Sequence, residues 1–387
     1  MAKEDAKTIQ LVDRILERAI ADGSSDVHIE PRKDQIRVRF RVDGVLVGRP
    51  PIPTDLTNSV ISRIKVMAQI DIAERRMPQD GAFRFDFEDG YVDVRVSTFP
   101  TEYGQKVVMR LLRRDPSSLD LGRLGFSPRL AARMREYTAQ SLGMVLITGP
   151  TGSGKTSTLY ALLNDIDATA RNIVTLEDPI EYRFPDVIQS QVHHKIGFTF
   201  AKGLRAILRQ DPDVILVGEM RDGETADIAF KAALTGHMVL SSLHTNSAME
   251  TFVRLFDMGL ERYVVASALN ALLSQRLVRK LCAYCRAPDH PDEKLRSELD
   301  LHAEGPAELY KSVGCPKCFG TGFRGRMGIF ELIEVDDQLN DIVKSDSLTY
   351  VELRKFLETR GYHGLRNAGY ALAKKGLTSI DEVYRVT

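Results

Sequence analysis

The sequence predicts an α/β protein in which a small α+β domain precedes a larger domain built on a mostly parallel sheet. Two observations predict this fold class. Residues 36–96 contain stretches that alternate apolar and charged residues, which is the period of half-buried antiparallel strands. From residue 143 onward, short continuous apolar runs alternate with helical segments, a pattern typical of a parallel sheet covered on both faces.

The length and the charge balance limit the class of protein. The chain has 387 residues, more than one compact core usually holds, so two or three domains are expected. Lys plus Arg and Asp plus Glu number 53 each, a balance that does not favour a nucleic-acid or membrane surface. Because neither a membrane-spanning run nor a signal peptide is evident, we expect a cytoplasmic protein without a transmembrane segment.

Residues 1–112 are predicted to form the first domain. Residues 9–20 place apolar side chains on one helix face: Ile9, Val12, Ile15, Leu16, Ala19 and Ile20. A strand over 36–42 leads into a turn at Asp43-Gly44, and a second hairpin over 83–96 turns at Asp89-Gly90. Residues 113–128 have the composition of a linker.

The second half of the chain is predicted to contain three regions. Residues 129–281 hold the predicted parallel strands, at 144–148, 173–177, 214–218 and 238–243. Residues 282–328 form a loop-rich module with all the cysteines, and residues 329–387 a mostly helical region. Its last segment, "GLTSIDEV", reads as a turn and a capped final helix.

A glycine-rich loop follows the first of these strands and opens a helix. The segment "GPTGSGKT" is a full G-x-x-x-x-G-K-[ST] motif, in the strand–loop–helix context that makes the motif credible. Its backbone N–H groups and the helix N-terminus favour phosphate, Lys155 would neutralise the β- and γ-phosphates, and Thr156 would bind Mg²⁺. The alternative is a turn with a surface lysine. The predicted nucleotide-binding residues are Gly149, Pro150, Thr151, Gly152, Ser153, Gly154, Lys155, Thr156 and Ser157.

Charged residues follow three other strands, at the sheet edge where ligands meet parallel strands. "VILVGEM" ends at Glu219, with Gly218 where an aspartate is usual, and "SSLHT" ends at His244. "TLEDPIEY" carries three carboxylates, of Glu177, Asp178 and Glu181, which would repel one another without a nearby Mg²⁺ or arginine. We predict a catalytic role for Glu177. The alternatives are a solvated carboxylate, a structural histidine and a charged loop. His237 follows a helix-ending glycine and reads as a cap.

The four cysteines form two C-x-x-C pairs, Cys282 with Cys285 and Cys315 with Cys318. Two such pairs on a loop-rich stretch predict a structural tetrahedral Zn²⁺ site, with no coordination position left for catalysis. Metal-free thiols or a redox pair are the alternatives.

Taken together, these motifs resemble the secretion ATPases that drive type II secretion and assemble type IV pili. The resemblance covers nearly the whole chain and implies a PAS-like N-terminal domain, a RecA-like ATPase domain and a ring of six subunits. "TLEDPIEY" matches the family's Asp box, "ILVGEMRD" its atypical Walker B and "TGHMVLSSLHT" its His box. The resemblance implies that the chain binds ATP and Mg²⁺, that Glu219 is the catalytic glutamate and that His244 senses the γ-phosphate.

The resemblance also implies two arginines that reach the nucleotide from the N-terminal domain. The segment "VDVRVSTFPTEYGQKVVMR" supplies Arg95 and Arg110, and strand alternation turns Arg95 away from the valine face. The alternative for Arg95 is a solvated strand arginine. The implied partners are further copies of the chain and an inner-membrane platform protein, with no nucleic acid, which would place the protein peripherally at that membrane.

Several points stay open at this stage. The family's assembly and secretion members usually carry a further N-terminal domain that docks to the platform, whereas this sequence starts close to the PAS-like region. The sequence does not separate type II secretion from pilus assembly. A RecA-like nucleic-acid translocase is the alternative function, and a regulatory module with little turnover is another. The balanced charge counts against the translocase.

Overall fold

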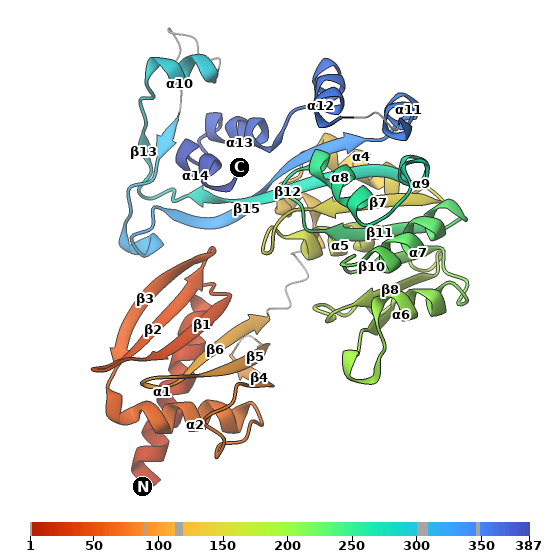
Figure 1. The fold of residues 1–387 in the computed structure, drawn as a ribbon. Helices are drawn as coiled ribbons and strands as arrows, with labels where there is room; N and C mark the ends of the chain where they lie inside the picture. The colour runs from red at the N-terminus through yellow and green to blue at the C-terminus, as the bar shows by residue number, and fades with distance from the viewer. Residues whose placement is uncertain (1, 89, 113–118, 300–308, 346–348) are drawn as a thin grey trace. The chain divides into compact units, whose positions relative to one another are not determined.

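The computed structural model describes residues 2–88, 90–112, 119–299, 309–345 and 349–387 (Figure 1). The chain folds into two compact units, Met1–Asp115 and Pro116–Thr387, and each is described by itself. Among the residues that the structure describes, no helix combines the length and the apolar character that a membrane crossing requires.

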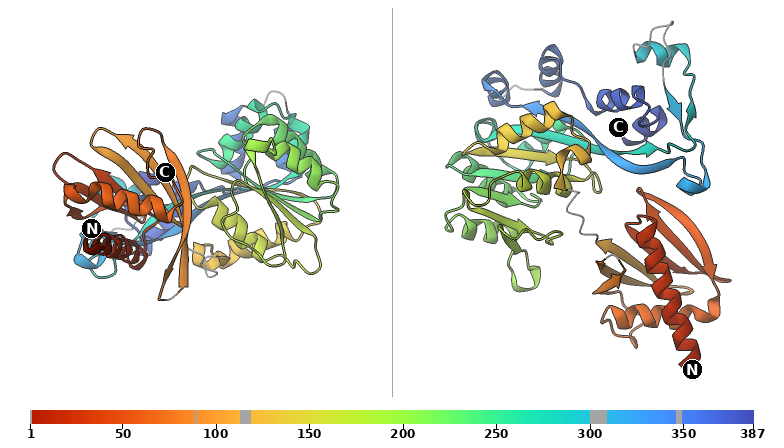
Figure 2. Two further views of the ribbon diagram at one scale, coloured as in Figure 1. Left: turned by 90° about the horizontal axis from the view of Figure 1, so that it is seen from below. Right: turned by 180° about the vertical axis from the view of Figure 1, so that it is seen from behind.

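The first unit is a six-stranded sheet with its helices packed on one face (Figure 2). Every neighbouring pair in the strand order β3-β2-β1-β6-β5-β4 is antiparallel. The elements are α1 (Ala2–Ala21), β1 (Asp26–Pro31), β2 (Ile36–Val42), β3 (Val45–Ile52), the 3₁₀ turn η1 (Thr54–Leu56), α2 (Thr57–Met67), β4 (Gln79–Phe87), β5 (Gly90–Thr101) and β6 (Gly104–Leu112).

The local patterns predicted α1 and the strands β2 to β5, whereas β1, α2 and β6 were not predicted. On the predicted helix face, Val12, Leu16 and Ala19 are buried against the sheet, whereas Ile9 is exposed. The β2–β3 hairpin turns at Asp43-Gly44, where both residues have positive φ. Of the second predicted turn, residue 89 lies outside the described residues. The PAS-like character implied by the resemblance stays a prediction.

The second unit is built on a seven-stranded sheet with the order β15-β12-β7-β11-β10-β8-β9. All neighbouring pairs are parallel except β12 with β15. The strands are β7 (Gly143–Thr148), β8 (Ile173–Glu177), β9 (Ile188–Gln191), β10 (Val214–Val217), β11 (Met238–Leu243), β12 (Leu269–Leu281) and β15 (Phe323–Glu334). The parallel-rich sheet expected from the apolar runs is therefore confirmed.

Helices cover both faces of this sheet, as Figure 2 shows edge-on. One face carries α6 (Phe200–Ile207), α7 (Gly223–Leu234), α8 (Ala248–Asp257) and α9 (Arg262–Ala268), and the other α3 (Leu121–Leu124), α4 (Pro128–Thr138) and α5 (Lys155–Asn164). Side chains of β7 alternate between these two cores, with Met144 and Leu146 in the first and Val145 and Ile147 in the second. This is why the strand is apolar throughout.

Shorter elements complete the second unit. They are η3 (His194–Ile196), β13 (Ala287–Pro288), α10 (Glu293–Glu298), β14 (Tyr310–Lys311), η4 (Pro316–Cys318), α11 (Asp337–Lys344), α12 (Tyr350–Thr359), α13 (Leu365–Lys374) and α14 (Ile380–Val386). The final helix begins as predicted, because the Ser379 side chain accepts a hydrogen bond from the Glu382 N–H and caps α14.

Two segments differ from the sequence expectation. Residues 113–118 of the predicted linker lie outside the described residues, but 119–128 pack into the second unit, where Leu119, Leu121 and Phe126 are buried. Strands β9, β12 and β15 were not predicted. Because β15 spans residues 323–334, it crosses the expected boundary at 328/329, and its pairing with β12 joins the cysteine module to the sheet.

Candidate functional site

The loop between β7 and α5 has a backbone that only glycine adopts readily. Gly152 and Gly154 have φ of +80° and +89°, in the left-handed region. A Cβ on Gly149, at φ +149°, would lie 2.6 Å from both the Gln275 carbonyl oxygen and Ser153 Oγ. The loop is thus held close to β12 with no room for a larger side chain.

The polar groups of this loop fit a bound phosphate chain. Helix α5 has no side-chain cap at Gly154, so its first N–H groups remain available to an anion. The Ser153 hydroxyl is buried and makes no hydrogen bond within the described residues. Thr156 is exposed in the first turn of α5, where its hydroxyl can meet a hydrated cation.

Lys155 is buried beneath the loop. Its Nζ donates to the carbonyl oxygens of Gly149 at 2.8 Å and Pro150 at 3.1 Å, and lies 3.4 Å from His244 Nδ1. Burial, opposed by the negative charge of Glu219 and assisted by the positive charge of Arg276, lowers the pKa of Lys155 to about 8. The ammonium is therefore a poorly solvated cation that an incoming anion would stabilise.

Glu219 and His244 meet at the ends of two adjacent parallel strands, β10 and β11. His244 Nε2 lies 3.3 Å from Glu219 Oε2. Arg221 donates to the other Glu219 oxygen and lies 3.9 Å from Asp178 Oδ2. The structure thus brings Lys155, His244 and Glu219 together, and of the three carboxylates in "TLEDPIEY" Arg221 lies near that of Asp178.

Glu177 was predicted as a catalytic acid, but its side chain points into the core and is 3% exposed. Its oxygens accept hydrogen bonds from Tyr160, from Thr175 Oγ1 at 2.5 Å and from Gln189 Nε2 at 3.0 Å. The carboxylate therefore joins α5, β8 and β9, and these contacts favour a structural role over direct contact with a nucleotide.

Three residues near the loop were missed by the sequence analysis: Arg221, Gln275 and Arg276. Gln275 Nε2 donates to the Ser153 carbonyl oxygen at 2.7 Å and fixes the loop to β12. Arg276 donates to the carbonyl oxygens of Asn246 and Val386. The polar run Ser274-Gln275-Arg276 in the middle of a mostly apolar segment, "LNALLSQRLV", was the available signal.

Arg95 and Arg110 belong to the first unit, where they are direct partners across β5 and β6. Val92, Val94 and Val96 are buried on the opposite face, so the predicted orientation of Arg95 is correct. Arg110 Nε donates to Asp26 Oδ1 at 3.0 Å. The pair places two guanidinium groups side by side on the sheet face away from the helices.

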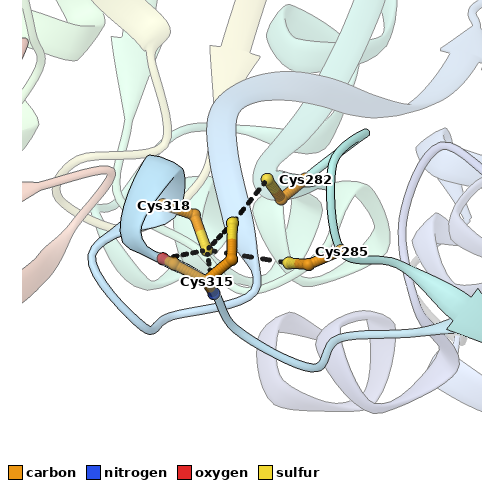
Figure 3. Close-up of side chains that lie close together, drawn as sticks. All are labelled: Cys282, Cys285, Cys315 and Cys318. Carbon is orange, nitrogen blue, oxygen red and sulfur yellow. Dashed lines mark hydrogen bonds between the residues drawn. The ribbon is translucent and has the colours of Figure 1, made fainter.

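The four cysteine sulfurs converge, as Figure 3 shows, from two separate turns. Sγ–Sγ separations are 4.0 Å for Cys282–Cys315 and 3.8 Å for both Cys285–Cys318 and Cys315–Cys318, and all four lie within 4.8 Å of one another. A tetrahedral zinc site with Zn–S bonds of about 2.3 Å has S–S edges of about 3.8 Å. The cluster can therefore hold a metal ion.

One thiol of this cluster is prepared to ionise. Burial alone would raise the pKa of Cys318, but the N–H groups of Cys315 and Gly322, each 3.2 Å from its sulfur, bring that pKa down to about 6. The thiolate is the form of cysteine that ligates metals, and the two backbone N–H groups stabilise that form.

The comparisons with known proteins agree with this geometry. The family model described as Type II/IV secretion system protein matches residues 1–385. Type II secretion system ATPase E of Vibrio cholerae is 45% identical over 386 residues, 100% of this chain and 76% of that protein. Type IV pilus assembly ATPase PilB of Myxococcus xanthus is 45% identical over 388 residues, 99% of this chain and 68% of that protein.

A solved structure is similar along nearly the whole chain. The crystal structure of the pilus retraction motor PilT with bound ADP has a TM-score of 0.63 and 26% identity, covering 97% of this chain and 96% of that one. The similarity therefore extends to both units and is not confined to the glycine-rich loop.

Proposed function

Because the chain belongs to the family of type II/IV secretion system proteins, we propose that it is a motor ATPase for assembly of a type IV pilus or a type II secretion pseudopilus. The relatives named above include one ATPase of each system, so the proposal keeps both. None of them is a nucleic-acid translocase, and that alternative is dropped.

A single observation carries the proposal: His244 contacts both Lys155 and Glu219 beside a loop that fits phosphates. Lys155 and the start of α5 hold the β- and γ-phosphates, and the Thr156 hydroxyl holds Mg²⁺. Bound Mg²⁺ would neutralise charge on those phosphates. ATP as the nucleotide follows from the family.

Glu219 is proposed to prepare the water. It orients the molecule and takes its proton as the oxygen adds to the γ-phosphorus, while the bond to the bridging oxygen breaks and ADP leaves. His244 contacts both Glu219 and Lys155, so a change at either group reaches the other through one imidazole ring. This supports a role for His244 in sensing the γ-phosphate.

We further propose that Arg95 and Arg110 supply positive charge to the nucleotide during the cycle, in a ring of six copies. Their pairing across β5 and β6 supports a joint action. Arginine near a transferring phosphoryl group stabilises the charge of the transition state. The chain is proposed to act in the cytoplasm, against a platform protein of the inner membrane.

The cysteine cluster is proposed to bind Zn²⁺. Its S–S spacing and the N–H···S bonds to Cys318 support this ligand, and four thiolates leave no open position. The ion would hold the two turns together and take no part in hydrolysis.

Phosphate release from ATP by the purified chain tests the proposal, together with sedimentation in a non-hydrolysable analogue. We expect turnover that single-stranded DNA does not stimulate, and a hexamer with the analogue. Absence of turnover, or turnover only with DNA, would contradict the motor. A monomer under all conditions would contradict the ring.

A further inference from the structure

Two buried charged side chains bind the loop that follows His244, residues 245–248, here called the His244 loop. Arg276 Nη2 donates to the Asn246 carbonyl oxygen at 2.5 Å, and Glu331 Oε1 accepts from the Ala248 N–H at 3.0 Å. Arg276 is 8% exposed and Glu331 3%. One charge thus binds a carbonyl and the other an N–H group of the same short loop.

The same two side chains also hold the C-terminal helices. Arg276 Nε donates to the Val386 carbonyl oxygen, at the end of α14, at 3.2 Å. Glu331 Oε2 accepts from the Leu365 N–H, the first residue of α13, at 3.1 Å, and Tyr362 donates to Oε1. Each buried charge therefore joins the His244 loop to one C-terminal helix.

The strand that carries Arg276 also holds the phosphate loop. Gln275, its neighbour on β12, donates to Ser153 O, and Arg276 Nη1 donates to the Gln275 carbonyl oxygen at 3.1 Å. That carbonyl oxygen packs against Gly149, where an added Cβ would lie 2.6 Å from it. The positions of the phosphate loop, the His244 loop and α14 are thus fixed by two consecutive residues.

We propose that Arg276 and Glu331 are positioning residues for hydrolysis: they set His244 against Lys155 and Glu219, and couple that position to α13 and α14. A displacement of these helices is passed to His244 through the two side chains. This inference rests on the ATPase activity proposed above.

The energetics of burial support this reading. Burial costs both Arg276 and Glu331 their hydration, so the two charges contribute little net stability compared with apolar side chains of the same size. Burial accordingly lowers the pKa of Arg276, and Glu331 opposes that effect. The two side chains instead fix the orientation of the His244 loop, because they bond a carbonyl and an N–H group that apolar side chains would leave unbonded.

The chain offers a matched control for the test. Glu382 is another fully buried carboxylate of the C-terminal region, and it accepts from Arg279 at 2.6 Å and from Arg385. It holds α14 to β12 as Arg276 does, but its partners lie outside the His244 loop. A purely structural role would make Glu331→Gln and Glu382→Gln behave alike.

Two measurements on Arg276→Lys, Glu331→Gln and Glu382→Gln test the inference. For the first two variants we expect kcat to fall about tenfold or more while KM for ATP changes less than about threefold, because small misplacements cost rate more than binding. For Glu382→Gln we expect a lower melting temperature and kcat near that of the wild type. Equal kcat losses in Glu331→Gln and Glu382→Gln would overturn the inference.

Hydrogen exchange of residues 245–248 supplies a readout that needs no activity. We expect exchange about tenfold faster or more in Arg276→Lys and Glu331→Gln than in the wild type, and no change in Glu382→Gln. Unchanged exchange in the first two would also overturn the inference. If Arg276→Lys does not fold, Glu331→Gln decides. Absence of turnover by the wild type would contradict the proposed function alone, and the exchange result would still stand.

Discussion

The Nδ1 atom of His244 lies 3.4 Å from Nζ of Lys155, and the same ring places Nε2 3.3 Å from Glu219. In the tautomer with its proton on Nε2, the imidazole accepts from the ammonium and donates to the carboxylate. Three residues from three different elements are thereby joined in a continuous chain.

Nucleotide binding is expected to weaken at alkaline pH because of Lys155. Burial brings the pKa of this lysine to about 8, so the ammonium is complete below that pH and is lost above it. Bound phosphates favour the charged form, so affinity should be constant below pH 8 and then fall by up to about tenfold per pH unit.

Fluorescent ATP-analogue titrations from pH 6.5 to 9.5 measure this dependence. Lys155→Arg is the control, because a guanidinium keeps its charge over the whole pH range. Whatever the absolute affinity of this variant for the ATP analogue, that affinity should not fall above pH 8. A wild-type affinity that is flat to pH 9.5 would show that the phosphates do not depend on the Lys155 charge.

Glu177→Gln is expected to reduce stability more than catalysis. The substitution would place a second amide group beside Gln189 Nε2 in a buried position. The Tyr160 hydroxyl would also lose its charged acceptor. We expect a loss of about 1–3 kcal/mol in the free energy of unfolding, measured by urea denaturation. The value of kcat should stay within about threefold of the wild type.

The opposite pattern would restore Glu177 as a catalytic acid. Thr175→Val removes a donor to the same carboxylate without touching the carboxylate itself, and serves as the companion variant. If kcat collapsed in Glu177→Gln but not in Thr175→Val, with stability intact in both, the structural reading would be wrong.

Cys282→Ser is expected to lose the metal and lower the melting temperature. Metal-binding free energy at such a site is also folding free energy, so loss of one of four ligands weakens both. We expect less than about half the zinc per chain, by atomic emission, and a melting temperature at least about 5 °C lower. Tyr284→Ser is the control, because Tyr284 lies between Cys282 and Cys285 but is 70% exposed. Full zinc content and an unchanged melting temperature in Cys282→Ser would contradict the zinc assignment.

Arg95→Ala is expected to lower kcat without lowering stability. An arginine that acts on the transferring phosphoryl group contributes about 10³-fold or more in rate in other phosphoryl-transfer enzymes, so we expect a loss of at least about tenfold. Arg18→Ala is the control, because Arg18 is an exposed arginine of α1 that pairs with Asp22. Turnover that stays at the wild-type level in both variants would leave Arg95 as a solvated strand residue.

Much of the fold and the phosphate loop could be predicted because their signals are local. Glycine spacing, apolar runs and strand-end residues each lie within a few positions of what they determine. Strand β15 was missed because Gly325 and Gly328 interrupt its pattern. A residue far away in the sequence requires glycine at position 328, since a Cβ there would lie 2.9 Å from the Leu124 carbonyl oxygen.

The supporting residues of the site escaped prediction for the same physical reason. Gln275 is 122 positions from Ser153, and Arg276 is 110 positions from Val386, so their contacts exist only after folding. Glu177 shows the converse error. Its position at a strand end was read correctly, but the pattern did not say that its side chain turns toward Tyr160 in the core.

We propose above that Glu219 orients the attacking water and takes its proton during ATP hydrolysis, in a site that also contains Lys155 and His244. The most direct test is steady-state ATP turnover of the wild type, Glu219→Gln and Glu224→Gln, with ATP affinity measured in parallel. Glu224 is a matched control, because it is an exposed glutamate at the start of α7 that pairs with Arg205. We expect Glu219→Gln to lower kcat about 10²-fold or more with ATP affinity retained, and Glu224→Gln to change neither kcat nor ATP affinity. A Glu219→Gln variant that turns over ATP at the wild-type rate would contradict this proposal.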